Sequence, residues 1–350
     1  MRQAVVITIL FCMIPGLYGE DYTKLKFSLK GVGGESYTQE IFKQETKKIF
    51  FFISPHCRFS KKFYKFISIL TGTRKNQFAI YLVSPNYKQS FIPDDLAYTD
   101  VEINLEGMKT ISRRHQFNAP FIYDGESQII TKALEVNTTP TVVFLDEQNR
   151  LLYKGKIGEI TPKGSVDTSY FEEIIRGNNS NKTIVTKVRG SEIKTREDLP
   201  NTTRILKRYA NETVKLVDAD KEKIEFFTKF HNRKVALFFL WSIDDKESRE
   251  NLLKITEVYK IYRKRGLSLI TICISQDKER ILENLKLAQS SGYNFRSDFY
   301  QVNQIFNLSG INDQITPSLL AVDKAGLLKF KIQDNIEILD IRSRVLELLD

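Results

Sequence analysis

A cysteine at a predicted helix start is the first candidate for chemistry. The motif SPHCRFS (54–60) follows the apolar run KIFFFIS and precedes the helical pattern KKFYKFISIL. The dipole of a helix favours the thiolate in its first turn, and His56, Arg58 and Lys61 add positive charge there. Thiolates attack disulfides and peroxides. We therefore predict Cys57 as the candidate nucleophile, with His56 and Arg58 in support and Ser60 as a hydrogen-bond donor to it.

The other two cysteines do not suggest a second reactive site. Cys12 lies in the apolar N-terminal segment, and Cys273 lies in the strand-like run LITICIS, where cysteine acts as a small hydrophobic residue. We interpret Cys273 as core filler, with a resolving cysteine as the alternative. Three cysteines and three unclustered histidines exclude a disulfide scaffold and a standard zinc site, and we expect His115 and His231 at the surface.

Other enzyme classes lack their motifs. The sequence has no G-x-G-x-x-G, no phosphate loop, no H-E-x-x-H, no G-x-S-x-G and no C-x-x-C-H. We therefore predict no cofactor and no metal. Lys and Arg number 53 against 43 Asp and Glu, a net charge of +10. Because the excess is interleaved with acids along both halves, it favours a solvated surface, and we expect no nucleic-acid partner.

The first nineteen residues have the pattern of an export signal. Arg2 precedes an apolar run over 4–17, which is shorter than the roughly 20 residues needed to span a bilayer. We predict a signal peptide at 1–19 and an exported protein, periplasmic or secreted. We expect no transmembrane span in the mature chain.

The elements expected around Cys57 occur twice. Each copy has a strand, a turn, a helix, a second strand, further helices and a Thr-Pro step before a hairpin. WSIDDKESRE (241–250) falls on ISPHCRFSKK (53–62), and TPSLLAVDKAGLLKF falls on TPTVVFLDEQNRLLY. The pattern predicts an α/β fold with a mixed sheet flanked by helices in each copy. At 350 residues the chain suits two domains, which we place at 20–190 and 214–350 with a polar linker at 191–213.

These features together resemble the thioredoxin-like superfamily. The closest resemblance is to its redoxin branch, which includes TlpA-like thiol oxidoreductases and alkyl-hydroperoxide-reductase-like peroxiredoxins, and it covers nearly the whole mature chain. It implies two tandem thioredoxin-like domains, with Cys57 as the family nucleophile and Ser60 at the position of its resolving cysteine. It also implies that Thr139 and Pro140 form the family's cis-proline step, whose backbone aligns a substrate disulfide or chain.

The second copy departs further from the family. Asp245 and Ser248 stand at its two cysteine positions, and Pro317 stands at its cis-proline. We read this as a degenerate second site in a domain that supports, docks or dimerises. Asp244 and Asp245 are expected to cap the helix, and Trp241 to pack in the core.

Two function classes stay open. A lone Cys57 cannot close a disulfide with Ser60, so exchange would run through a mixed disulfide that an external thiol or Cys273 resolves. Peroxidase chemistry is less favoured, because Phe50 stands where peroxiredoxins carry a proline. We thus expect a monothiol disulfide oxidoreductase or antioxidant in cell-envelope redox homeostasis, with a protein thiol or disulfide as partner. The alternative is a non-enzymatic binding or scaffold protein that uses the grooves beside Pro140 and Pro317.

Overall fold

The chain divides into two compact units that interleave along the sequence. The computed structural model describes residues 22–177, 183–220, 222–224, 226, 234–298, 300, 302, 317–333 and 336–350. Within these, the first unit takes residues up to 54, 59–85 and 112–193, and the second takes 55–58, 86–111 and residues from 194. The predicted signal peptide, His231 and Thr316 lie outside the described residues.

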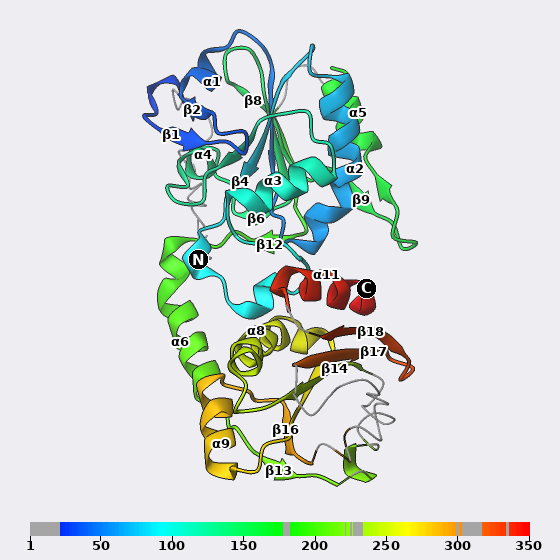
Figure 1. Cartoon of the computed structure of the whole chain (residues 1–350). Helices are drawn as coiled ribbons and strands as arrows, with labels where there is room; N and C mark the ends of the chain where they lie inside the picture. Colours follow the sequence, from blue (N-terminus) through cyan, green and yellow to red (C-terminus); the bar gives the residue numbers. More distant parts are fainter. Residues whose placement is uncertain are drawn as a thin grey trace, which may run out of the picture. The chain divides into compact units, whose positions relative to one another are not determined.

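The first unit is built on a six-stranded mixed sheet of order β11-β8-β7-β3-β4-β5 (Figure 1). β3 runs parallel to β4, and β4 to β5, while β7 is antiparallel to both β3 and β8. The strands of the sheet are β3 (Lys48–Phe52), β4 (Ala79–Ser84), β5 (Phe121–Tyr123), β7 (Thr141–Leu145), β8 (Leu151–Gly155) and β11 (Ile184–Val185). Its helices are α1 (Glu40–Lys43), α2 (Arg58–Thr73), α4 (Ile129–Ala133) and α5 (Ser169–Ile175).

Short strands surround this sheet. They form two-stranded antiparallel pairs: β1 (Ser28–Lys30) with β2 (Ser36–Thr38), β9 (Glu159–Ile160) with β10 (Val166–Asp167), and β6 (Thr138–Thr139) with β12 (Ser191–Glu192). A short 3-10 helix, η1 (Tyr22–Lys24), begins the described chain.

The continuous apolar run in β3 explains its central place. All five residues of KIFFF are buried, as expected for a strand covered on both faces. α2 covers the sheet with the apolar face predicted from its spacing, including Phe63, Ile67 and Leu70. The strand and helix thereby fix the turn between them, which carries Cys57.

The second unit has its own six-stranded mixed sheet, of order β13-β16-β15-β14-β17-β18. Its strands are β13 (Val217–Asp218), β14 (Val235–Trp241), β15 (Leu267–Cys273), β16 (Tyr293–Arg296), β17 (Ser318–Val322) and β18 (Leu328–Gln333). Its helices are α6 (Leu199–Ala210), α8 (Lys246–Tyr262), α9 (Lys278–Leu287) and α11 (Ile338–Leu349), with η4 (Arg196–Asp198) and η5 (Arg263–Arg265). The segment 86–111 adds η2 (Lys88–Ser90), η3 (Pro93–Leu96) and most of α3 (Leu105–Arg114).

Five strands follow the same order in both sheets. β14, β15, β16, β17 and β18 repeat the pairing and direction of β3, β4, β5, β7 and β8. Even the bulge recurs, between Phe144 and Leu145 in one hairpin and between Ala321 and Val322 in the other. The predicted α/β class, two bodies that each have a mixed sheet flanked by helices, is confirmed by this arrangement.

The sixth strand distinguishes the two sheets. β11 joins β8 at one edge of the first sheet, whereas β13 joins β16 at the opposite edge of the second. The segment 191–213, expected as a polar linker, contains β12 and the helix α6. It is therefore largely ordered secondary structure.

Candidate functional site

Cys57 lies directly before α2, at the end of the turn that leaves β3. Its side chain is buried, with 1% exposed. The first turn of α2 holds no acidic residue and carries Lys61. The start of the helix is therefore basic, and burial restricts access to the thiol.

Ser60 fixes the shape of the turn. Its side chain is fully buried, and its Oγ accepts a hydrogen bond from the backbone N–H of Ser54 at 3.3 Å. The hydroxyl of Tyr64 donates to the carbonyl of Ser54 at 3.2 Å. Both backbone groups of Ser54 are thus held by α2 side chains. As an acceptor Ser60 anchors the strand-to-helix turn, and its donation to Cys57 stays a prediction.

Two aromatic rings from the segment 86–111 contact the residues on either side of Cys57. His56 is buried, and its ring centroid lies 5.0 Å from that of Phe91. The exposed Arg58 places its guanidinium 5.6 Å from the ring centroid of Tyr98. All of these residues belong to the second unit. His56 and Arg58 therefore tie the Cys57 turn to this segment.

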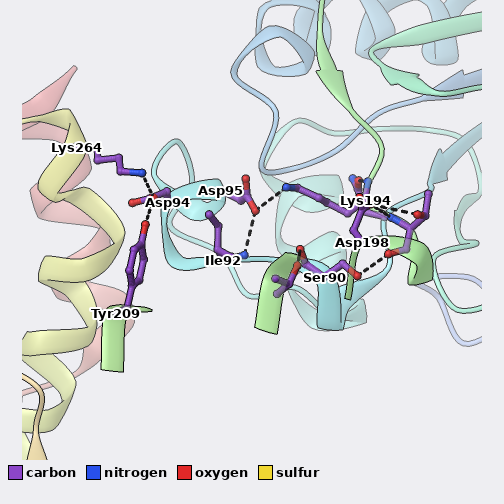
Figure 2. Close-up of polar contacts among 11 residues, drawn as sticks. Ser90, Ile92, Asp94, Asp95, Lys194, Asp198, Tyr209 and Lys264 are labelled. Atoms are coloured by element: carbon purple, nitrogen blue, oxygen red, sulfur yellow. Dashed lines mark hydrogen bonds and ion pairs between the residues drawn. The ribbon is translucent and has the colours of Figure 1, made fainter. Parts of the chain in front are cut away.

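Acidic residues attach the segment 86–111 to the helices of its unit (Figure 2). The carboxylate of Asp94 accepts a hydrogen bond from the hydroxyl of Tyr209 and forms an ion pair with Lys264. Asp95 accepts from the backbone N–H of Ile92 at 3.0 Å and pairs with Lys194 at 3.0 Å. The start of the segment is thus held by side chains that come much later in the sequence.

A buried arginine holds the other end of the segment. Arg342 of α11 has 2% of its side chain exposed and pairs with Glu102 at 3.1 Å. Its guanidinium also donates to the carbonyls of Thr99 and Val101, each at 3.2 Å. The hydroxyl of Tyr262 donates to the carbonyl of Thr99 at 2.7 Å. A buried guanidinium needs such partners, so Arg342 makes the segment part of the fold of its unit.

Thr139 and Pro140 lie at the same end of the first sheet as the β3 turn. Their peptide bond is cis, and both side chains are buried. Thr141, which follows, is the register partner of Phe52 at the end of β3. The hydroxyl of Thr141 donates to the carbonyl of Thr138 at 2.6 Å. The topology therefore brings the predicted cis-proline step and the end of the cysteine-bearing strand to one edge.

A cavity of about 520 Å³ opens beside Pro140 in the first unit. Its lining combines apolar side chains with three basic residues and one acidic residue, and the guanidinium of Arg189 lies 5.5 Å from the ring centroid of Phe59. The residues that line it are Phe59, Phe63, Pro140, Lys156, Ile157, Gly158, Glu159, Ile160, Lys187, Val188 and Arg189. This is the groove that the sequence predicted beside Pro140.

The second copy of the site is built for stability. Asp245 is the N-cap of α8, and its carboxylate accepts from the backbone N–H groups of Glu247 at 3.2 Å and Ser248 at 2.8 Å. Ser248 and Pro317 are buried. Asp245 satisfies helix N–H groups where the first copy carries Cys57. The predicted capping role is confirmed.

Trp241 and Cys273 are core residues. They are register partners at the ends of β14 and β15, and both are fully buried in one apolar cluster. Burial raises the pKa of the Cys273 thiol to about 11. Cys273 is therefore held as a neutral thiol, which agrees with the prediction of core filler.

His115 differs from its expected surface position. It is half-buried, with its ring centroid 4.7 Å from that of Tyr64 and 5.9 Å from that of Phe117. Burial lowers its pKa, and the charges of Arg114 and Lys61 lower it further. Phe117 is only two residues away, but Tyr64 lies in α2, about 50 residues earlier in the sequence, and the local polar stretch did not reveal that contact.

The described part of the chain carries neither a metal-ligand cluster nor a membrane-spanning helix. Within it, no group of three or more His, Cys, Asp or Glu side chains could hold a metal ion. Among its helices, none combines the length and apolar character needed to cross a bilayer.

The sequence did not identify Phe91, Tyr98 or strand β12 as parts of the site. The aromatic residues lie in FIPDDLAYTD, whose acidic run and proline indicate only a loop. β12 is two residues long and polar. Their roles depend on pairing with distant parts of the chain, which periodicity does not reveal.

Comparison with known proteins gives similarities of fold. No protein-family model and no curated protein matches the sequence. A hypothetical protein from Sinorhizobium meliloti 1021 is similar in structure, with 23% identity and a TM-score of 0.40, over 49% of this chain and 91% of that one. A secreted Mycobacterium tuberculosis disulfide oxidoreductase homologous to E. coli DsbE has 11% identity and a TM-score of 0.34, over 45% and 99%. The exposed lipoprotein thioredoxin Etrx1 of Streptococcus pneumoniae has 17% identity and a TM-score of 0.32, over 43% and 99%.

Proposed function

We propose that this chain is a shielded monothiol disulfide-exchange protein in which Cys57 is the nucleophile. The observation that carries the proposal is the position of Cys57, a thiol in the turn that follows β3 and directly before α2. The equivalent helix start in the second unit carries the capping residue Asp245. One copy thus keeps a group suited to exchange, and the other keeps a structural cap.

The proposed reaction needs one protein thiol and two partners. The Cys57 thiolate attacks one sulfur of a protein disulfide, the S–S bond breaks, and the other sulfur leaves as a thiolate. One external thiol then attacks the partner's sulfur in the mixed disulfide, releases Cys57 as a thiolate and forms a disulfide with the partner. A second external thiol attacks the first thiol's sulfur in that disulfide, so that the partner leaves with both sulfurs reduced and the two external thiols are joined as a disulfide. Ser60 holds the turn and takes no part in electron transfer.

Variants of the two cysteines test this role. The purified protein is incubated with a disulfide-bonded protein substrate, and mixed disulfides are trapped by acid and identified by mass. We expect Cys57→Ser to abolish the adduct and Cys273→Ala to leave it unchanged, because burial keeps Cys273 a neutral thiol. An intact chain that forms no adduct over hours, or forms it through Cys273, would contradict the proposal.

Export and a role in cell-envelope thiol homeostasis belong to the same proposal. They rest on the signal-like pattern of residues 1–19. Fractionation of expressing cells should find a mature protein that begins near Glu20 outside the cytoplasm. A chain that stays in the cytoplasm with residues 1–19 attached would contradict export and leave the chemistry to be judged separately.

Burial of Cys57 favours a second candidate, a non-enzymatic binding protein. A side chain with 1% exposed and two cysteine positions replaced by Asp245 and Ser248 suit a fold kept for recognition. This candidate predicts that Cys57→Ser leaves partner capture intact, while a bulky substitution beside Pro140 abolishes it. The monothiol proposal predicts that Cys57→Ser removes covalent capture.

A further inference from the structure

The chain itself occupies the backbone edge that leads into Pro140. β12 pairs antiparallel with β6, with Ser191 opposite Thr139 and Glu192 opposite Thr138. The N–H of Ile193 donates to the carbonyl of Asn137 at 2.9 Å. Hydrogen-bonded pairs alternate along an antiparallel ladder, so Ser191 and Thr139 form the next hydrogen-bonded position. The backbone beside the cis-proline is therefore engaged by residues 190–193.

A glycine makes this close approach possible. A Cβ added to Gly190 would lie 1.9 Å from the carbonyl oxygen of Thr139, far inside any allowed contact. Any other residue here would push the strand away from the edge. The fit between the two backbones is thus specific to the sequence R-G-S-E-I at 189–193.

Side chains hold both ends of this strand. Ile193 has 6% exposed and packs in the apolar cluster of the first unit that also contains Val136. Arg189 stacks on Phe59. Backbone pairing with side-chain anchors is the way in which an extended peptide binds to a sheet edge.

We propose that β12 occupies the position at which the β6 edge binds a peptide ligand from a partner protein. The Thr138–Thr139 edge recognises an extended peptide with a glycine facing the Thr139 carbonyl and an aliphatic residue three positions later. In the resting protein the chain's own residues 189–193 fill this edge, so a partner binds by displacing them. The inference rests on the proposed function only for the disulfide exchange that would follow binding.

Variants that release β12 test the displacement. Ser191→Pro removes the backbone donor at the hydrogen-bonded position, and Gly190→Val forces the strand away from Thr139. Gly72→Ala in α2 is the matched control, because a Cβ there meets no atom within 4 Å. All three are made in a Cys57→Ser background, so that binding is measured without chemistry, and circular dichroism reports folding.

The probe is a fluorescent synthetic peptide with the sequence of residues 186–195. A tethered strand competes at an effective concentration near the millimolar range, so we expect each released variant to bind the probe at least about 10-fold more tightly than the parent or Gly72→Ala. A probe with valine at the glycine position should not bind. Equal affinity in all folded variants, or binding of the valine probe, would overturn the inference. If a variant misfolds, hydrogen exchange of the Ile193 amide in the parent, with and without excess probe, gives the same test, since displacement must accelerate it.

Separate outcomes identify failure of each proposal. With Cys57 restored and a disulfide-bonded form of the probe, binding without a mixed disulfide supports the peptide edge and contradicts the exchange function. Mixed disulfide formation at the same rate in parent and released variants supports exchange and contradicts displacement.

Discussion

The two described thiols differ in their surroundings and not in their burial. Cys273 is enclosed by the strands of the second sheet, and burial raises its pKa to about 11. Cys57 is as buried, but it precedes a helix whose first turn carries lysine and no acid. The proposed exchange chemistry thus depends on access to Cys57, whereas Cys273 contributes packing.

The raised pKa of Cys273 predicts a loss of stability in alkali. The folded state holds this proton more tightly than the unfolded chain, so the contribution is complete below pH 9.0 and is lost as the pH rises to about 11. Between about pH 8 and about pH 10.5, the free energy of unfolding should fall by about 2 kcal/mol more in the parent than in Cys273→Val. Urea unfolding at both values measures this. Equal losses in the two proteins would show that the pKa of the Cys273 thiol is the same in the folded protein as in the unfolded chain, which would contradict the prediction.

Ser60 should matter for stability more than for acid–base chemistry. Ser60→Ala leaves the buried N–H of Ser54 without its acceptor, at a cost of about 1–2 kcal/mol. Ser68→Ala, in the same helix, should change the free energy of unfolding by less than about 0.5 kcal/mol. Thermal unfolding of both variants measures the difference. Equal stability of the two would contradict the anchoring role.

At the level of elements, the sequence pattern predicted the strands, helices and hairpins that short-range patterns specify. The buried runs of β3, β14 and β15, the helical face of α2 and the two hairpins were all expected, because continuous apolar runs and turn residues specify them. The segment 86–111 and β12 were not expected in their places. Their positions follow from Arg342, Tyr209 and Gly190, whose partners lie about 50 to more than 200 residues away in sequence. Hydrophobic periodicity does not reveal contacts between residues so far apart in the sequence.

Arg342 should be the main anchor of the segment 86–111. Arg342→Met removes the buried guanidinium from Glu102 and the carbonyls of Thr99 and Val101, and loss of one partner from a buried charge network costs about 3–5 kcal/mol. Arg344→Met, two residues along α11, removes an exposed pair with Asp340 and should cost less than about 1 kcal/mol. Urea unfolding compares them. A small effect of Arg342→Met would mean that the segment is held mainly by its apolar contacts.

At the scale of the whole molecule, the two sheets share the order of five strands but differ in the segments that surround them. The second unit keeps no thiol at its own helix start, and it includes both the segment 86–111 and the turn with Cys57. Phe91 and Tyr98 link that segment to His56 and Arg58. The segment whose aromatic rings contact the neighbours of Cys57 thus belongs to the same unit as Cys57 itself.

This arrangement predicts that a remote anchor sets the reactivity of Cys57. If the thiol reacts only when the segment 86–111 opens, Arg342→Met should increase the rate of Cys57 alkylation by roughly 100-fold, since each 1.4 kcal/mol of lost closure is about tenfold in the open population. Arg344→Met should leave the alkylation rate unchanged. Phe91→Ala removes the ring beside His56 and should increase the alkylation rate directly, with the Arg342 contacts still in place. Alkylation followed by mass spectrometry at neutral pH gives the rates, and hydrogen exchange of amides 99–105 reports opening in the same samples. Faster amide exchange in Arg342→Met with an unchanged Cys57 rate would separate the thiol from the segment, and the shielding would then have to come from the turn itself.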